Sequence, residues 1–298
     1  MKRIIWFVAV NIAVLITMTV IVAALGLDRY LGAYGLSLGG LLMLSGVFGF
    51  GGAFVSLALS KWIAIRSMGV RLIDVPRSPV ESRVLAAVAA HAQRLRVGMP
   101  AVGIFDSLQL NAFATGARRN HALVAVSSAL AEMMDPRQLD AVLGHEMTHV
   151  VNGDMITLGL LQGVLNTFVI FLARVIGSAI DGVVGGRREA GGQGGVFYFL
   201  IVIVLEVLFG VFATMIVMAF SRRREYRADA GGAALAGTQS MIGALRTLQR
   251  ESAAQLPGQL RAFGINGQAP GGALRRLFMS HPPIEDRIAA LERAGLGV

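Results

Sequence analysis

Residues 144–154 read GHEMTHVVNGD, and this stretch decides how the rest of the chain is interpreted. It holds two histidines, His145 and His149, that stand four residues apart. On an α-helix these positions lie on one face, so both imidazoles can reach the same metal ion. Glu146 is turned by about 100° from its neighbour and can take a proton from water held at the ion. The pattern therefore predicts a zinc site with Glu146 as the catalytic base.

The flanking residues favour a helix for this motif. Asp135 can cap the helix, Pro136 suits its first position, and Gln138 completes a capping-box pattern. Gly153 is suited to end it. An HExxH pattern has roughly a 0.3% chance of arising at random in a chain of this length and composition. The alternative reading is a polar surface helix that happens to carry two histidines.

The composition predicts a membrane protein with a modest soluble part. Of 298 residues, 55% are hydrophobic and 15% are charged, whereas globular domains carry about 25% charged residues. The chain has no cysteine, which excludes disulfides and thiolate zinc sites, so a metal must be held by histidines and carboxylates. The net charge of +9 is assigned to arginines at span ends rather than to a nucleic-acid partner.

Four windows are long and apolar enough to span a bilayer, namely 4–25, 36–59, 156–180 and 196–220. Ten Lys and Arg residues flank them on one side and three on the other, which predicts cytoplasmic termini and a cytoplasmic 60–155 region. The ten are Lys2, Arg3, Lys61, Arg66, Arg71, Arg77, Arg222, Arg223, Arg224 and Arg227, and the three are Arg29, Arg187 and Arg188.

The predicted organisation alternates membrane and soluble segments. Residues 1–60 hold the first two spans, 61–155 a zincin-like region, 156–220 two further spans, and 221–298 a second cytoplasmic part. A glycine-rich linker, 182–195, joins the last two spans. Arg174 and Glu206 fall inside these spans, where a charge usually needs a partner. They are interpreted either as a pair that fixes helix packing or as part of a substrate path.

The soluble part is expected to be α+β. An apolar-periodic helix is predicted over 81–98 and ended by Gly98, with His91 as an ordinary helix residue. Strand-like runs follow at 101–107, 111–116 and 121–128. The fold class is therefore a mostly helical polytopic membrane protein with a small β-sheet in its zincin-like domain.

A third protein ligand is needed, and the sequence favours a carboxylate. The extended zinc motif would place a histidine at position 155, which is Met155. Glu225, just beyond the last span, is the best candidate, and Asp229 one turn later can accept a hydrogen bond from a ligand imidazole. The alternative is that both acids pair with neighbouring arginines at the membrane interface.

HEMTH, REYRADAGG and SHPPIEDR, in this order and with NAFATG upstream, resemble the HtpX family of bacterial membrane zinc proteases, which is related to CAAX prenyl protease 1. The resemblance implies one zinc ion per chain, with Glu225 as third ligand and Asp229 as its outer partner. It also implies substrate or transition-state contacts by Asn111, His281 and Arg287.

The same resemblance implies proteolytic quality control of membrane or misfolded proteins in the bacterial inner membrane, under stress. The predicted four spans, against seven in the prenyl protease, argue against a prenylated substrate. A peptide substrate is expected to pair with an edge strand near 111–116. Two alternatives are a protease that cuts within the bilayer, disfavoured by the polar DPRQLD and NGD flanks, and a non-catalytic scaffold or transporter, supported only by Arg174 and Glu206.

Overall fold

The computed structural model describes residues 37–184, 196–254 and 276–295, and the chain divides into two compact units. The helical unit comprises 1–56 and 159–217, and the sheet-bearing unit comprises 57–158 and 218–298. The predicted first span, 4–25, and most of the glycine-rich linker lie outside the described residues.

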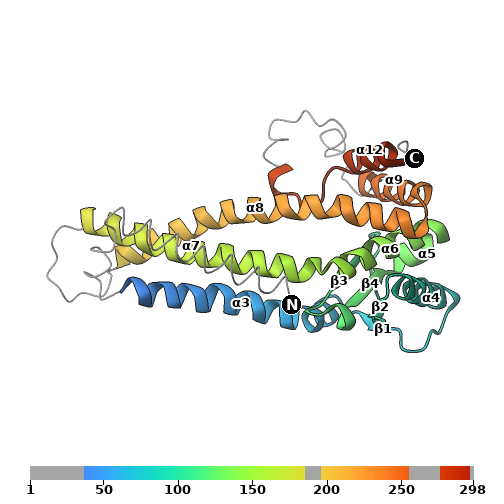
Figure 1. The fold of residues 1–298 in the computed structure, drawn as a ribbon, viewed down its shortest axis with the longest axis horizontal. Coiled ribbons are helices and arrows are strands. Elements are labelled where there is room, and N and C mark those ends of the chain that lie inside the picture. The colour runs from blue at the N-terminus through green and yellow to red at the C-terminus, as the bar shows by residue number, and fades with distance from the viewer. Residues whose placement is uncertain (1–36, 185–195, 255–275, 296–298) are drawn as a thin grey trace. The chain divides into compact units, whose positions relative to one another are not determined.

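Three helices in the described residues are long and apolar enough to cross a membrane. They are α3 (Leu38–Ser67), α7 (Asp154–Val184) and α8 (Val196–Ala236), which overlap the predicted spans 36–59, 156–180 and 196–220 (Figure 1). Within the helical unit, a Cβ added at Gly49 would lie 2.6 Å from the backbone nitrogen of Thr167, so this glycine lets α3 and α7 pack closely.

The predicted pairing of the two intramembrane charges is present in the helical unit. Arg174 Nη1 lies 2.6 Å from Glu206 Oε1, which joins α7 to α8. A second bond from the same nitrogen reaches the carbonyl of Ile170, one turn earlier. The pair therefore connects two helices and satisfies two charges that would be costly alone in lipid.

The sheet is small and mixed. Its strands are β1 (Arg71–Leu72), β2 (Ala101–Phe105), β3 (Ala112–Thr115) and β4 (Leu123–Ser127), in the order β1-β2-β4-β3. β2 and β4 are parallel, whereas the two outer pairs are antiparallel, so β3 is an edge strand. Three strands fall in the predicted runs; β1 has only two residues, too few for a periodic signal.

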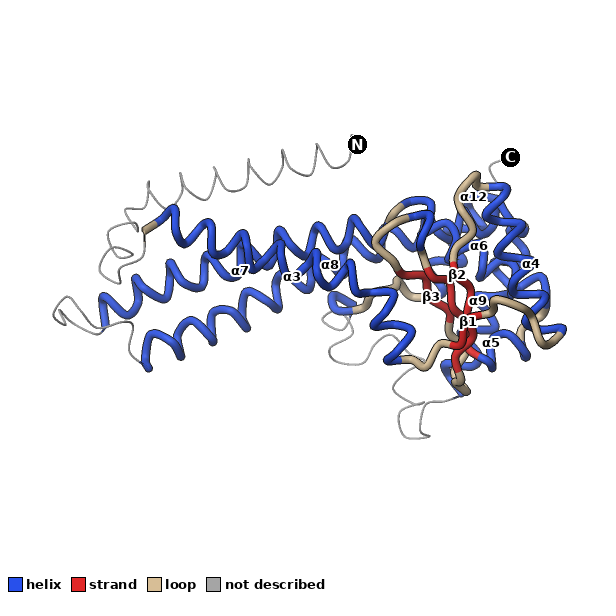
Figure 2. Tube along the Cα trace, turned by 90° about the horizontal axis from the view of Figure 1, so that it is seen from below, coloured by secondary structure: helices blue, strands red, loops and turns tan. Residues whose placement is uncertain are grey.

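Both faces of the sheet are covered. On one face, alternate residues such as Ile104, Val124 and Val126 form a core with helices α4 (Pro79–Arg94), α5 (Ser128–Met133) and α6 (Pro136–Asn152). On the other face, Leu123 and Ala125 pack toward the last turns of α3. Figure 2 shows the strands beside these helices. Burial on both faces explains why β4 reads as an almost continuous apolar run.

The prediction that Gly98 ends the first soluble helix is wrong. Helix α4 stops at Arg94, and Arg96 adopts a left-handed φ of 54°. The amide of Val97 donates to the Ala92 carbonyl at 3.0 Å, and that of Arg96 to the Gln93 carbonyl at 3.1 Å. These two bonds form a Schellman motif, which usually has glycine at the left-handed position. An arginine there gives no sequence signal for a helix end.

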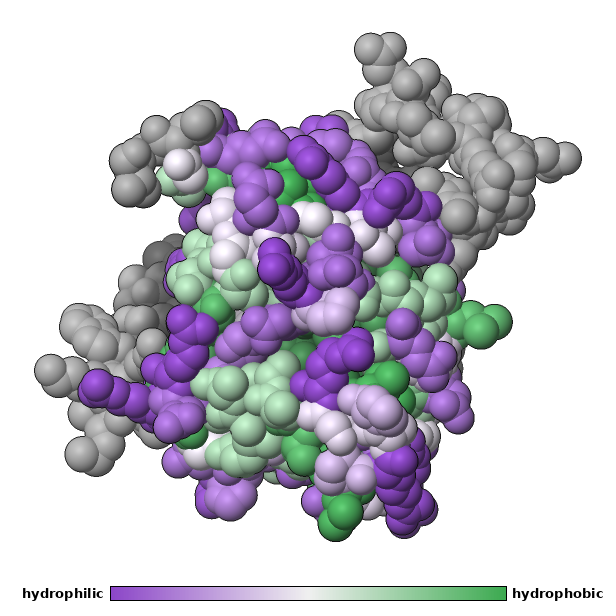
Figure 3. All heavy atoms as spheres, turned by 90° about the vertical axis from the view of Figure 1, so that its right-hand side faces the viewer, coloured by the Kyte–Doolittle hydropathy of each residue, from purple (hydrophilic) through white to green (hydrophobic). Residues whose placement is uncertain are grey.

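Two further helices, α9 (Thr238–Ala254) and α12 (Ile284–Gly295), complete the sheet-bearing unit. Met241, Leu245 and Leu291 pack them together and onto Ala141 of α6. Viewed from this end, the molecule shows hydrophilic side chains spread between smaller apolar areas (Figure 3). This surface is typical of a part that faces water.

Candidate metal centre

Helix α6 carries the HExxH motif and has well-defined ends. Asp135 Oδ1 accepts a hydrogen bond from the Arg137 amide at 2.9 Å, and Pro136 occupies the first turn, as predicted. Gly153 ends the helix with φ 63° and ψ 39°, a left-handed conformation that glycine adopts without strain. The predicted capping box is not formed by Gln138. Its side chain instead accepts a hydrogen bond from the Thr247 hydroxyl.

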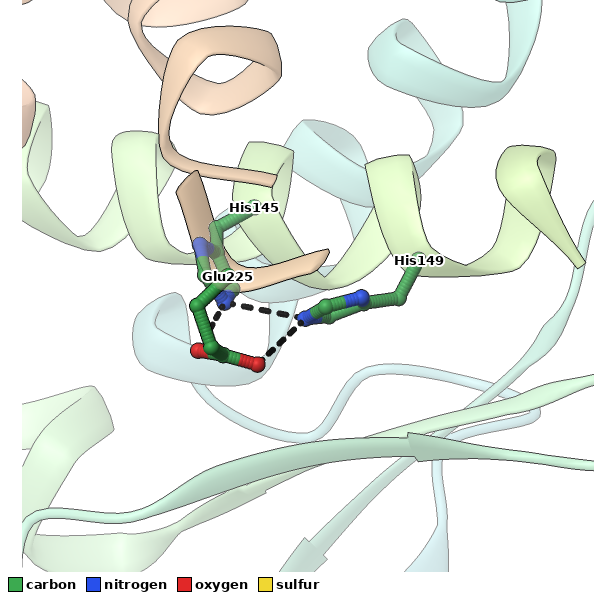
Figure 4. Close-up of side chains that lie close together, drawn as sticks. All are labelled: His145, His149 and Glu225. Carbon is green, nitrogen blue, oxygen red and sulfur yellow. Dashed lines mark hydrogen bonds and ion pairs between the residues drawn. The ribbon is translucent and has the colours of Figure 1, made fainter. Parts of the chain in front are cut away.

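The structure brings His145, His149 and Glu225 together (Figure 4). The two Nε2 atoms are 3.2 Å apart, and they lie 3.6 Å and 3.3 Å from the Glu225 carboxylate oxygens. Ligand atoms around a tetrahedral ion with bonds of about 2.0–2.1 Å lie about 3.3 Å apart. The three side chains therefore fit an ion of that size with little rearrangement.

Three glycines let α8 approach α6 closely enough to deliver Glu225. A Cβ at Gly232 would lie 2.8 Å from the Ala141 carbonyl oxygen, and one at Gly231 would overlap with Thr148. A Cβ at Gly144 would lie 3.3 Å from Gly232 Cα. The helix backbones are thus in direct contact beside the cluster, which fixes the separation of its ligands.

Each imidazole has an aspartate at its second ring nitrogen. His149 Nδ1 lies 2.7 Å from Asp154 Oδ2, in a hydrogen bond. His145 Nδ1 lies 3.0 Å from Asp229 Oδ1, a close ion-pair contact that does not meet hydrogen-bond geometry. Such carboxylates fix the tautomer that leaves Nε2 available to a metal.

Two buried arginines hold these aspartates. Arg287 donates to Asp229 through Nε at 2.8 Å and through a second nitrogen. Arg224 donates through Nη1 to the backbone carbonyl of Asp154 at 2.6 Å. The sequence did not predict the contact of Asp154 with His149 or the role of Arg224. The available signal was the position of Asp154, directly after the Gly153 helix stop.

The electrostatics of the cluster favour a bound cation. Burial lowers the pKa of His149, but hydrogen bonds to Asp154 and Glu225 outweigh it and raise the pKa to about 9. Burial raises the pKa of Glu225, yet the contacts with His145, His149 and His281 hold it well below its usual range. The carboxylates thus stabilise positive charge on the imidazoles, and the same negative field stabilises a metal ion that takes the place of the proton.

Glu146 is buried next to the cluster, with a relative exposure of 9%. Its charge raises the pKa of both His145 and His149, which places its carboxylate within electrostatic reach of the proposed ligands. The position suits a group that exchanges protons with a molecule held at the cluster.

The other three predicted site residues are His281, Arg287 and Asn111, and they differ in burial and in their contact with the cluster. His281 Nδ1 lies 2.6 Å from Glu225 Oε2, and 60% of its side chain is exposed. Arg287 is buried behind Asp229. Asn111 precedes β3 and exchanges hydrogen bonds with Ser127 through its backbone. Among the described residues, Asn111 forms no hydrogen bond with His145, His149 or Glu225.

Comparison with known proteins gives one family. Residues 78–294 match Peptidase family M48. "Protease HtpX" of Stenotrophomonas maltophilia (strain R551-3) is 54% identical over 290 residues, which covers 97% of each chain. "Protease HtpX" of Xanthomonas oryzae pv. oryzae (strain MAFF 311018) is 53% identical over 294 residues, or 98% of each. The crystal structure of S. mikatae Ste24p aligns with a TM-score of 0.61 at 17% identity, over 97% of this chain and 67% of that one, which shows a shared fold.

Proposed function

We propose, from the premise that this chain belongs to peptidase family M48, that it is a zinc-dependent endopeptidase of the bacterial inner membrane. The observation that carries the proposal is the cluster of His145, His149 and Glu225, whose ligand atoms all lie within 4.8 Å of one another. Glu146 beside it supplies the base that peptide hydrolysis needs.

The proposed zinc ligands are the two Nε2 atoms and the Glu225 carboxylate. When bound, zinc supplies a Lewis acid that lowers the pKa of water to about 7 and polarises a carbonyl. Asp154 and Asp229 hold the imidazoles from behind, and Arg224 and Arg287 hold the aspartates. For Arg287, burial favours this supporting role over direct contact with substrate.

Glu146 is proposed to take the proton from the attacking water and to give it to the leaving amine. A carboxylate can serve both steps because it is left protonated after the first. His281 has an exposed side chain, and its Nδ1 lies 2.6 Å from Glu225 Oε2. We assign it a hydrogen bond to the substrate oxygen in the transition state.

The edge strand β3 is proposed to hold the substrate peptide. It pairs with β4 on one side only in the described sheet, and it packs against the same core as α6. An extended peptide can add to such an edge by backbone hydrogen bonds. Asn111, directly before β3, is exposed, and its side chain forms no hydrogen bond among the described residues, so its amide is assigned to the substrate backbone.

The membrane setting is proposed from sequence and helix lengths together. Four spans follow from the four apolar windows, and cytoplasmic termini and a cytoplasmic active site follow from the ten-to-three distribution of basic residues. Glu225 lies five residues beyond Phe220, the end of the fourth predicted span, on the single helix α8, or roughly 7–8 Å along its axis. Substrates are then membrane or misfolded proteins that emerge near this face, consistent with a role in quality control under stress.

The test is zinc content and cleavage for the purified full-length chain in detergent. Glu146→Gln should keep one zinc per chain while cleavage of an unfolded membrane protein falls by about 10²–10⁴-fold. His145→Ala and Glu225→Ala should lose the metal. Glu132→Gln makes the same change at an exposed position on α5 and serves as the matched control.

If Glu146→Gln cleaves the substrate at the wild-type rate, the assignment of Glu146 as the base is wrong. If the wild-type protein purifies without metal and gains no activity with added zinc, the proposal that it is a zinc-dependent endopeptidase is wrong. The quality-control role has its own test, which compares the membrane proteomes of cells that carry wild type or Glu146→Gln. The variant cells should accumulate full-length substrates.

A further inference from the structure

A basic cavity of about 600 Å³ lies in the sheet-bearing unit, outside the metal centre. Three arginines, Arg96, Arg118 and Arg119, line it together with Asn120 and His121. In the described parts of the chain, none of these three arginines forms an ion pair with an acidic residue. The cavity therefore gathers three positive charges that have no ion-pair partner among the described residues.

The two loops that form the cavity are held together by a specific contact. The Gly98 amide donates to Asn120 Oδ1 at 3.1 Å. A Cβ at Gly98 would lie 3.1 Å from the Asn120 Cβ, so the glycine permits this close approach. The loop after α4 and the turn around Arg119–His121 are thus fixed against each other, which is the condition for a defined binding site rather than a loose charged surface.

Arg96 occupies an unusual backbone conformation at this place. With φ 54°, it is the only non-glycine residue of positive φ in the described chain. Glycine is the normal residue at this position of a Schellman motif, because a side chain is strained there. Strained residues cluster at functional sites. An arginine at such a position points to use of its guanidinium.

The lining also includes Ile156, the third residue of α7. Residues Asp154–Val183 of this helix form one of the candidate membrane spans. The cavity thus sits where a span begins, which is the level of the phospholipid phosphates in a bilayer. Basic pockets at such positions attract anionic headgroups. An arginine fork matches phosphate oxygens in geometry as well as charge.

We propose that this cavity binds the phosphate of an anionic phospholipid headgroup. The ligand chemistry is a phosphate ester held by Arg96, Arg118 and Arg119, with hydrogen bonds available from Asn120 and His121. The lipid is favoured over a soluble phosphate or an acidic polypeptide because Ile156 gives the cavity an apolar wall at the start of a span.

The test measures ligand binding to the zinc-loaded full-length chain in neutral detergent, by thermophoresis. The probes are short-chain phosphatidylglycerol, phosphatidylcholine of equal chain length, inorganic phosphate and tetraglutamate. Phosphatidylglycerol should bind at least 10-fold more tightly than each of the others. Arg118→Ala/Arg119→Ala should raise its Kd about 30-fold, the effect of two surface arginines near an anionic headgroup.

Two further variants separate a specific site from general charge or loss of fold. Arg83→Ala/Arg137→Ala removes two exposed arginines that line a different cavity of the same unit, and should change the Kd less than 3-fold. Arg96→Gly suits the left-handed backbone, so its Tm should not fall while the Kd rises about 5-fold.

Four outcomes would overturn the proposal. If both double variants weakened phosphatidylglycerol binding equally, the binding would reflect the overall positive charge of the unit and not a specific site. Equal affinity for phosphatidylcholine would exclude recognition of the anionic headgroup. Inorganic phosphate bound as tightly as phosphatidylglycerol would reassign the cavity to a soluble phosphate. Tighter binding of tetraglutamate, lost in Arg118→Ala/Arg119→Ala, would reassign it to an acidic polypeptide.

Discussion

Replacing Gly232 by alanine should weaken zinc binding strongly while lowering the stability of the fold only slightly. Gly232 lies where α8 touches α6, and an added Cβ would meet the Ala141 carbonyl oxygen at 2.8 Å and the His145 amide nitrogen at 3.1 Å. Both partners are backbone atoms in a helix and cannot rotate away. The two helices must move apart by about 0.6 Å to restore an ordinary contact of 3.4 Å.

This displacement has two effects of different size. Overpacking costs about 1–3 kcal/mol, but alanine is favoured over glycine in a helix by about 1 kcal/mol, which leaves a net loss of stability of about 0–2 kcal/mol. The metal site is less tolerant, because ligand distances must hold to about 0.2 Å. Glu225 on α8 would be drawn away from His145 and His149 on α6. Zinc affinity should therefore fall about 10–100-fold, as it does when a ligand loses its outer support.

The assay is a zinc competition titration against a chromophoric chelator, with a thermal melt in parallel. Gly210→Ala is the matched control, since it makes the same change on the same helix with no atom within 4 Å of the new Cβ. The control should bind zinc like wild type. A zinc Kd for Gly232→Ala within 3-fold of wild type would show that the helix contact does not set the ligand geometry.

Three further predictions follow from the contacts of single side chains. Asp154→Asn weakens the support of His149 and should lower zinc affinity about 10–100-fold in the same titration; unchanged affinity would contradict the assigned role. Arg174→Met leaves Glu206 unpaired in the membrane, at a cost of about 3 kcal/mol. It should therefore melt below the Arg174→Met/Glu206→Met double variant, and equal melting temperatures would exclude the coupling. Chelation of zinc should remove about 2.7 kcal/mol of stability relative to protein with zinc at 100 times its Kd. A melting temperature that ignores the chelator, or a Glu225→Ala protein that still responds to zinc, would refute metal binding at this cluster.

The sequence predicts well whatever depends on neighbours along the chain. The HExxH spacing, the Asp135 cap and the Gly153 stop are local signals, and the structure has each of them. Glu225 could be predicted only by adding that a zinc site with two histidines needs a third protein ligand. Three apolar windows likewise fall on helices long enough to cross a membrane.

What the sequence does not predict depends on where separate segments meet. Asp154 reaches His149 only because Gly153 turns the chain and α7 begins at once. Arg224 is one of ten basic residues counted for topology, and only the packing of α8 shows that it is buried. The contact at Gly232 requires knowledge of which helices cross, and at which residue.

The ligands of the proposed site are distant in the chain, and this affects when the site can form. His149 on α6 and Glu225 on α8 are 76 residues apart (225 − 149). At about 5–20 residues per second, a ribosome needs roughly 4–15 s to extend the chain from one to the other. During that interval the two predicted spans of 156–220 must leave the ribosome while the HExxH helix still lacks its third ligand. On the proposed ligand assignment, the nascent chain therefore lacks its third metal ligand until both predicted spans have been synthesised.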